Sequence, residues 1–290
     1  MNRQEFLNLP EVRQFVDWAA HRLTSIRVDF NIRSSSKVPG GVAGIVTGLD
    51  EVILHYRWRS DARGDGSWHE TVDTLRRLRN ALNNAANESE VLAACFAILA
   101  WGGDRNPNKG AGPFLSDMAA RNTLLRYIAD ARDGFRLDQA VIGADPPVIR
   151  MNAMLTKIHA LTSPDGLPIY DSRVAAAIAS IIEIWRRESG VDAPLSPALS
   201  FPATDAKRTV TRLFANAAAP RILRYAAGDP TRNTKDWAEA KIRLAWLMHA
   251  VLERNGELLA EHGLNRMHAF EASLFMIGYD VMCLAADARG

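Results

Sequence analysis

The feature that most constrains this fold is a helical spacing of apolar side chains that continues, with short interruptions, from residue 68 to residue 286. Apolar residues at positions i, i+3, i+4 and i+7 are typical of an amphipathic α-helix that buries one face. No repeat at solenoid periods accompanies this pattern. The spacing predicts helices over residues 68–85, 88–101, 114–131, 135–142, 148–162, 172–188, 206–218, 234–255 and 266–286.

The N-terminal part of the chain has a different pattern. Residues 1–25 carry apolar side chains on one helical face and predict a further helix. The GLDE segment at 48–51 fits a hairpin turn. Three runs rich in β-branched residues follow the helix, separated by Gly-rich or Ser-rich breaks, and predict strands: 26–33, 41–48 and 51–59. We therefore expect a mainly α protein with a small N-terminal antiparallel β-sheet.

The chain length suits one large domain or two modest ones, because it has 290 residues. We expect residues 1–66 to form an N-terminal helix and sheet packed on a helical domain over 67–290. The Pro/Ser-rich segment 189–205 fits either a surface loop or a boundary. With 48% hydrophobic and 23% charged residues, the composition is globular and excludes disorder, collagen and a disulfide scaffold.

Several patterns bear on compartment and cofactors. The longest uncharged run of the first half, 91–103, has 13 residues, which is short of the roughly 20 that span a bilayer, and the N-terminus lacks a signal-type apolar region. Cys95 and Cys283 offer neither a disulfide framework nor a CxxC zinc site, and the seven His are scattered. We expect a cytoplasmic monomer without a metal, another cofactor or a membrane partner.

The basic residues are unusual in kind, because 29 are Arg and only 6 are Lys, within a net charge of +2. The planar guanidinium fork suits phosphate groups, so the excess fits a nucleic-acid-binding face. A high-GC coding bias toward Arg explains the ratio equally well. Composition alone therefore leaves both interpretations open.

The segment 151–185 carries the chemistry, because it predicts a helix, a tight Pro/Gly turn over 163–168 and a second helix. Asp171 stands at the expected N-cap, where its carboxylate accepts hydrogen bonds from free backbone N–H groups. A carboxylate held there is also aimed and ionised, so it can stabilise a developing cation. Lys157 lies on the first helix, and the turn brings it back toward Asp171. The pair fits either a structural ion pair or a nucleophile with its partner carboxylate.

The stretch TKIHALTSPDGLPIYDSRVAAAI (156–178) resembles the Lys-helix, Pro-turn, Asp-helix core of the helix-hairpin-helix DNA glycosylase superfamily, in its 8-oxoguanine-glycosylase-like branch. AWGG (100–103) and EASLFMIGYD (271–280) also look similar to that branch. The resemblance implies that Lys157 is the Schiff-base lysine and that Asp171 is the catalytic aspartate. It further implies a DNA N-glycosylase, with or without lyase activity, that needs no cofactor.

Such an enzyme binds double-stranded DNA and holds a flipped-out base in a pocket. The resemblance and the residue types give Trp101 and Tyr170 as pocket candidates. The candidates for DNA contacts are Arg105, Asn106, Lys109, Gly110, Gly143, Arg150, Asn152 and Arg173. An oxidised purine follows from the resemblance, whereas a bulky modified base, as in phage DNA attacked by an antiviral defence, is the alternative substrate.

The chain also departs from the family pattern. The place of its Gly-hydrophobic-Gly hairpin reads VIGADPPVIRMN (141–152), with Gly143 but no second glycine, and Lys157 lies nearer to Asp171 than in well-known members. If Lys157 is not the nucleophile, water would attack and Asp171 would support the oxocarbenium. Glu271 fits a buried structural acid or a pocket residue. The alternative functions are a non-catalytic helical DNA-binding or protein-interaction module and a helical enzyme acting on small molecules.

Overall fold

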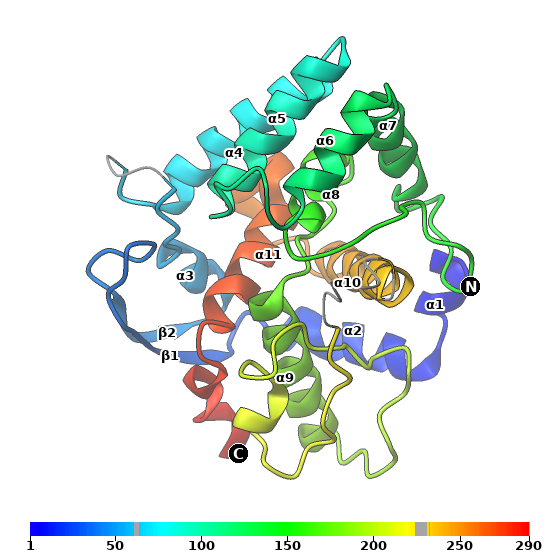
Figure 1. Ribbon diagram of the computed structural model, residues 1–290. Helices are drawn as coiled ribbons and strands as arrows, with labels where there is room; N and C mark the ends of the chain where they lie inside the picture. The colour runs from blue at the N-terminus through cyan, green and yellow to red at the C-terminus, as the bar shows by residue number, and fades with distance from the viewer. Residues whose placement is uncertain (61–63, 224–230, 232, 290) are drawn as a thin grey trace.

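The computed structural model describes residues 1–60, 64–223, 231 and 233–289. It is mainly α-helical with one small antiparallel sheet, as expected (Figure 1). The α-helices are α1 (Arg3–Leu7), α2 (Pro10–Arg22), α3 (Leu49–Leu54), α4 (Trp68–Asn83), α5 (Glu88–Trp101), α6 (Gly112–Ala120), α7 (Leu124–Gly134), α8 (Leu155–Thr162), α9 (Ser172–Glu188), α10 (Thr234–Arg254) and α11 (Arg266–Ile277). The short 3₁₀ helices are η1 (Val210–Arg212), η2 (Ala260–Asn265), η3 (Val281–Leu284) and η4 (Asp287–Arg289).

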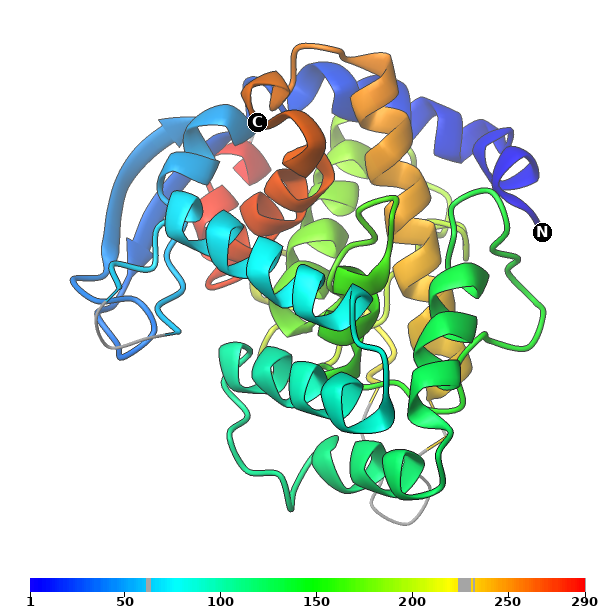
Figure 2. The same ribbon diagram turned by 90° about the horizontal axis from the view of Figure 1, so that it is seen from above.

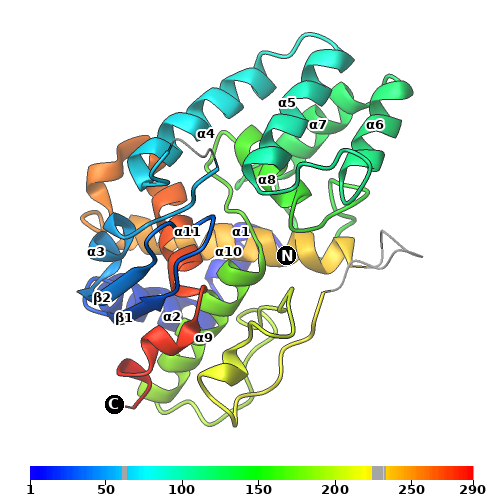
Figure 3. The same ribbon diagram turned by 60° about the vertical axis from the view of Figure 1, so that its left-hand side comes forward.

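The sheet has two strands among the described residues, β1 (Arg27–Ile32) and β2 (Val42–Thr47), paired antiparallel (Figure 3). The prediction of a strand over 51–59 is wrong, because residues 51–54 belong to α3 and residues 55–59 form neither helix nor strand. Leu49, Val52 and Ile53 are all fully buried, and their i, i+3, i+4 spacing is helical rather than alternating. Asp50 and Glu51 occupy the first turn of α3, where acids favour a helix. GLDE therefore starts a helix instead of turning a hairpin.

Four helices predicted from strong periodicity are confirmed within two residues of their expected ends: α4, α5, α9 and α10. Side-chain caps explain two of the starts. The Ser67 hydroxyl accepts the N–H of Glu70, and the side-chain oxygen of Asn87 accepts the N–H of Glu90. The helix expected over 1–25 is broken into α1 and α2, with Pro10 in the first position of α2.

Other predicted helices are shorter or missing. The helix expected over 114–131 is divided into α6 and α7 at Asn122, whose φ is +56°. Residues 135–142 form turns instead of a helix, because side chains take both backbone groups of Leu137. Asp165 accepts its N–H (3.0 Å), and the Trp246 indole donates to its carbonyl (3.0 Å).

Three further expected helices also end or begin differently. The helix expected over 148–162 starts only at α8, and 206–218 contains only η1, preceded by a turn in which Asp205 accepts the N–H of Lys207 (2.9 Å). The helix expected over 266–286 ends at Ile277. At Gly278, a Cβ would lie 2.0 Å from the Arg173 carbonyl oxygen, so the chain can pass close to α9 only with glycine there.

The helices that build the site surround one apolar core. In Figure 2, α4 and α5 lie side by side, and α10 crosses the molecule. Helix α11 packs on α9 and α3, while α8 packs on α4 and α5. The core is continuous from the N-terminal segment into the helical body. Within the described ranges, no helix combines the length and apolar character needed to cross a bilayer.

Candidate active site

Two neighbouring helices carry the candidate site, and local capping fixes the start of each. The side chain of Asn152 accepts the N–H groups of Met154 and Leu155, each at 2.9 Å. Asn152 therefore holds the turn that leads into α8, whose N-cap residue is Met154, and this contact occupies the side-chain oxygen of a residue predicted to touch DNA. Asp171 caps α9, because its Oδ1 accepts the N–H groups of Arg173 (2.9 Å) and Val174 (3.2 Å).

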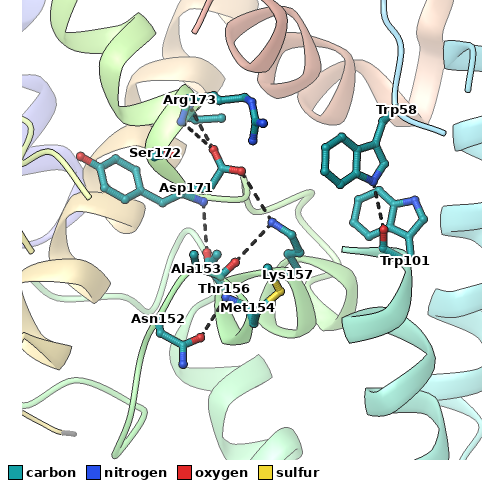
Figure 4. Close-up of polar contacts among 12 residues, drawn as sticks. Trp58, Trp101, Asn152, Ala153, Met154, Thr156, Lys157, Asp171, Ser172 and Arg173 are labelled. Atoms are coloured by element: carbon teal, nitrogen blue, oxygen red, sulfur yellow. Dashed lines mark hydrogen bonds and ion pairs between the residues drawn. The ribbon is translucent and has the colours of Figure 1, made fainter. Parts of the chain in front are cut away.

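The second carboxylate oxygen of Asp171 faces Lys157. The Lys157 Nζ lies 3.6 Å from Asp171 Oδ2 and donates to the Ala153 carbonyl (3.3 Å), as Figure 4 shows. Both side chains are 7% exposed. Ion pairs at the surface contribute little, whereas a nearly buried pair keeps a fixed geometry. The expected convergence of the two helices at these residues is thus present.

A fully buried lysine, Lys241 of α10, holds the backbone on which this pair depends. Its ammonium donates to the Thr156 carbonyl and hydroxyl, both at 3.0 Å, and to the Pro168 carbonyl. The Thr156 hydroxyl oxygen also accepts the N–H of Tyr170 (3.1 Å). Lys241 therefore links the residue beside Lys157 to the segment that leads into Asp171. Sequence reasoning missed it; the only available signal was a lysine within an apolar helical stripe.

Lys157 and Asp171 lie in the wall of a cavity of about 190 Å³. One water needs roughly 10–15 Å³ of such space, so the cavity can hold a small organic group. Its walls come from α4, α5, α8, α9 and α11 and from the segment after α3. Aromatic side chains make up much of the lining: Tyr56, Trp58, Trp68, Trp101 and Phe275.

Trp58 and Trp101 are tied together at one side of this cavity, because the Trp58 indole N–H donates to the Trp101 carbonyl (3.0 Å; Figure 4). Gly102 follows and also lines the cavity. A Cβ at Gly102 would lie 2.7 Å from Lys157 Cδ. Glycine therefore lets the end of α5 contact the aliphatic stem of the lysine.

Glu271 of α11 is the second acid in the cavity wall, so it is a pocket residue. Burial, together with the nearby charge of Asp171, raises the pKa of Glu271 to about 8, while Lys157 and Lys241 act in the opposite direction. Glu271 is thus largely protonated at neutral pH. A carboxyl group that keeps its proton in this way can act as a general acid.

Arg173 brings a cation to the same cavity. Its guanidinium stacks over Tyr279 at 4.3 Å, over Phe275 at 4.8 Å and over Trp58 at 5.7 Å from the ring centres. Its buried Nε has no hydrogen-bond partner within the described parts of the chain. This predicted DNA-contact residue therefore lies at the cavity, held by aromatic rings.

Tyr170 is not a pocket residue, and that prediction is wrong. Its side chain is fully buried, its hydroxyl donates to the Pro202 carbonyl (2.6 Å), and its ring packs near Phe201. The segment before α9 is extended, so successive side chains alternate in direction. Ile169 and Asp171 line the cavity, and Tyr170 between them points into the core.

The remaining predicted DNA-contact residues lie outside the cavity lining. Gly143 is fixed to α10, because its N–H donates to Glu239 and its carbonyl accepts from Lys235, each at 3.0 Å. The Arg150 guanidinium stacks on Phe114 at 5.3 Å. An exposed loop after α5 contains the other four: Arg105, Asn106, Lys109 and Gly110. Their contact with DNA stays a prediction.

The cavity wall thus combines an amine, a carboxylate and a protonated acid with an aromatic lining. Such a set can perform nucleophilic attack, proton transfer and stabilisation of a cation at one carbon centre. Within the described residues, no cluster of His, Cys, Asp and Glu could hold a metal ion. No protein-family model, curated protein or solved structure matches the chain.

Proposed function

We propose that the protein is a DNA N-glycosylase that excises a damaged or modified base. The observation that carries the proposal is the placement of Lys157 and Asp171, 3.6 Å apart in the wall of one aromatic cavity. The resemblance of residues 156–178 to helix-hairpin-helix glycosylases supports DNA as the substrate. An aromatic cavity also suits a flipped base, since stacking offsets part of the few kcal/mol that extrusion costs.

In the proposed reaction, Asp171 accepts a proton from Lys157, and the free amine attacks C1′ of the extruded nucleotide. The C1′–N bond breaks as the new C–N bond forms, and the departing base takes a proton from Glu271. The lysine nitrogen then gives its next proton to the ring oxygen as the C1′–O4′ bond breaks, and its lone pair forms the C=N bond of a protonated Schiff base. If water attacks instead, Asp171 stabilises the oxocarbenium, and the product is an abasic site.

The substrate class remains part of the proposal. An oxidised purine is the expectation from the resemblance. A bulky modified base, such as a hypermodified pyrimidine of phage DNA, is the alternative and would give the protein an antiviral role. Mass spectrometry of bases released from cellular and phage DNA would distinguish the two.

The test is incubation with duplexes that carry a panel of modified bases, followed by detection of abasic sites. We expect Asp171→Asn to abolish base release, because the amide caps α9 but cannot accept the proton or stabilise a cation. Asp145→Asn, at an exposed loop position outside the cavity, is the matched control and should leave base release unchanged.

Borohydride trapping separates the two reaction routes. A covalent protein–DNA complex that disappears in Lys157→Met but persists in Lys207→Met, an exposed control, supports the Schiff base. Base release without trapping supports water attack. If no DNA substrate yields base release and Asp171→Asn only lowers stability, glycosylase action is contradicted and a non-catalytic DNA-binding or protein-interaction module is favoured.

A further inference from the structure

Three cations from distant parts of the sequence meet beside the cavity. Lys37 lies in the loop between β1 and β2, Arg59 in the segment after α3, and Arg105 in the loop after α5. We call these three residues the basic cluster. The Arg59 N–H donates to the Lys37 carbonyl (2.8 Å) and its Nε to the Ser36 carbonyl (3.1 Å). Arg105 donates to the Ser60 carbonyl (2.9 Å).

Among the residues that the structure describes, acids do not balance the charge of the basic cluster. Within the described residues, no carboxylate lies at ion-pair distance from Lys37, Arg59 or Arg105. Burial, and then the charges of Arg105 and Arg59, lower the pKa of Lys37. Like charges held together cost free energy unless an anion joins them. The fold therefore maintains an arrangement that an anion would stabilise.

The basic cluster adjoins the rim of the cavity. The Lys37 ammonium lies 4.8 Å from the centre of the Trp58 ring, and Trp58 lines the cavity. Gly103 is exposed and directly follows the cavity residues Trp101 and Gly102. It lies close to Lys37 and Trp58, because a Cβ at Gly103 would lie 3.7 Å from Lys37 Cε and 3.9 Å from the Trp58 ring. An anion bound by the cluster would thus lie next to whatever enters the cavity.

We infer that the basic cluster binds backbone phosphates of the DNA strand that bears the extruded nucleotide, so that the β1–β2 loop takes part in DNA binding. The inference rests on the proposed function. A nucleotide whose base enters the cavity remains joined to phosphates on both sides, and these must pass the rim. Two guanidinium groups and one ammonium group can bind several successive phosphates, whereas a ligand with a single carboxylate would leave most of them unpaired.

The test measures binding of a fluorescent duplex with a central tetrahydrofuran abasic analogue, which needs no knowledge of the excised base. Anisotropy is recorded at increasing KCl. We expect the double variant Lys37→Gln/Arg105→Gln to bind the duplex roughly ten-fold more weakly at low salt, because it loses contacts to phosphates. The plot of log affinity against log salt concentration should also become less steep, by about 0.9 for each lost phosphate contact. The charge-keeping pair Lys37→Arg/Arg105→Lys should stay near the wild type.

The matched control is Arg13→Gln/Arg254→Gln, which removes the same charge from α2 and from the end of α10, away from the β1–β2 loop (Figures 1 and 2). It should leave the affinity and the slope nearly unchanged. If the wild type binds the duplex and the cluster variant binds equally well, this inference is overturned while the proposed function stands. If the wild type shows no salt-dependent DNA binding, or prefers an RNA duplex, the proposed function fails together with it.

Discussion

At the scale of single residues, the site depends on side chains that are already occupied by structural contacts. Asp171 gives one oxygen to the α9 backbone and the other to Lys157. The Lys241 ammonium holds Thr156, next to Lys157, and Pro168, in the segment that leads into Asp171. Breaking contacts of such buried groups costs about 1–3 kcal/mol each. The geometry of the candidate site is therefore determined by the same interactions that stabilise the fold.

Gly102 gives a prediction at this scale. In Gly102→Ala the new methyl group would collide with the Lys157 stem, which lies 2.7 Å from the built Cβ. We expect the lysine to move away from Asp171, so that the rate of borohydride trapping falls at least ten-fold while the salt-dependent affinity for DNA is retained. Single-turnover trapping kinetics measure this change.

Gly256→Ala is the matched control for that variant, because Gly256 has open space around its Cβ position. It should trap at the wild-type rate. Equal trapping by both alanine variants would show that the close contact between α5 and Lys157 does not position the amine.

At the scale of elements, the sequence pattern predicted the helices that have clear apolar periodicity. It failed where contacts with residues distant in the sequence determine the secondary structure. The run over 51–59 looked like a strand because of its β-branched residues, but burial of Leu49, Val52 and Ile53 selects a helix. Leu137 left the helical pattern because Trp246 and Asp165 bind its backbone. The Lys157–Asp171 contact was predictable, since a short turn joins their helices. Lys241 and Lys37 were not, because their partners are far away in sequence.

The contact between α4 and α11 gives a prediction of pH dependence. Arg79 donates to His268 Nε2 at 2.6 Å, and burial, with the charges of Arg79 and Lys241, lowers the pKa of His268 to about 3. Below pH 6.5 the unfolded state therefore binds more protons than the folded state, so stability falls as the pH decreases from about 6.5 toward 3. The slope is at most about 1.4 kcal/mol per pH unit for this histidine.

Urea unfolding at several pH values between 7 and 4 would measure the effect. His268→Gln, which has no charge to gain, should lose less stability on acidification than the wild type. His21→Gln, at an exposed position, should behave like the wild type. Parallel curves for all three proteins would contradict the assignment to His268.

At the scale of the whole molecule, the N-terminal segment is part of the main core. The rings of Phe6 and Trp246 lie 5.4 Å apart, and those of Phe15 and Trp185 lie 5.7 Å apart. Both phenylalanines are almost fully buried. Removing a buried Phe side chain typically costs 3–5 kcal/mol, which is a large share of the stability of a domain. The expected division into 1–66 and 67–290 therefore follows sequence character rather than separate cores.

We predict that residues 67–290 do not fold alone. The fragment should lack a cooperative urea transition and should be digested rapidly by proteases, because the surfaces of Trp185 and Trp246 would be exposed. Adding residues 1–66 as a separate chain should restore protection. A cooperative transition in the isolated fragment would contradict the prediction and make the helical part an independent unit.

Under the proposed function, Asp171 both caps a helix and supplies a reacting carboxylate, and this double use limits which residues can replace it. Asn, Ser and Thr start helices well but bring no negative charge, whereas Glu brings the charge on a longer side chain that is a poor helix start. Aspartate alone satisfies both demands. A substitution that abolishes the proposed chemistry can therefore leave the fold intact, but a glutamate that preserves the charge would damage both.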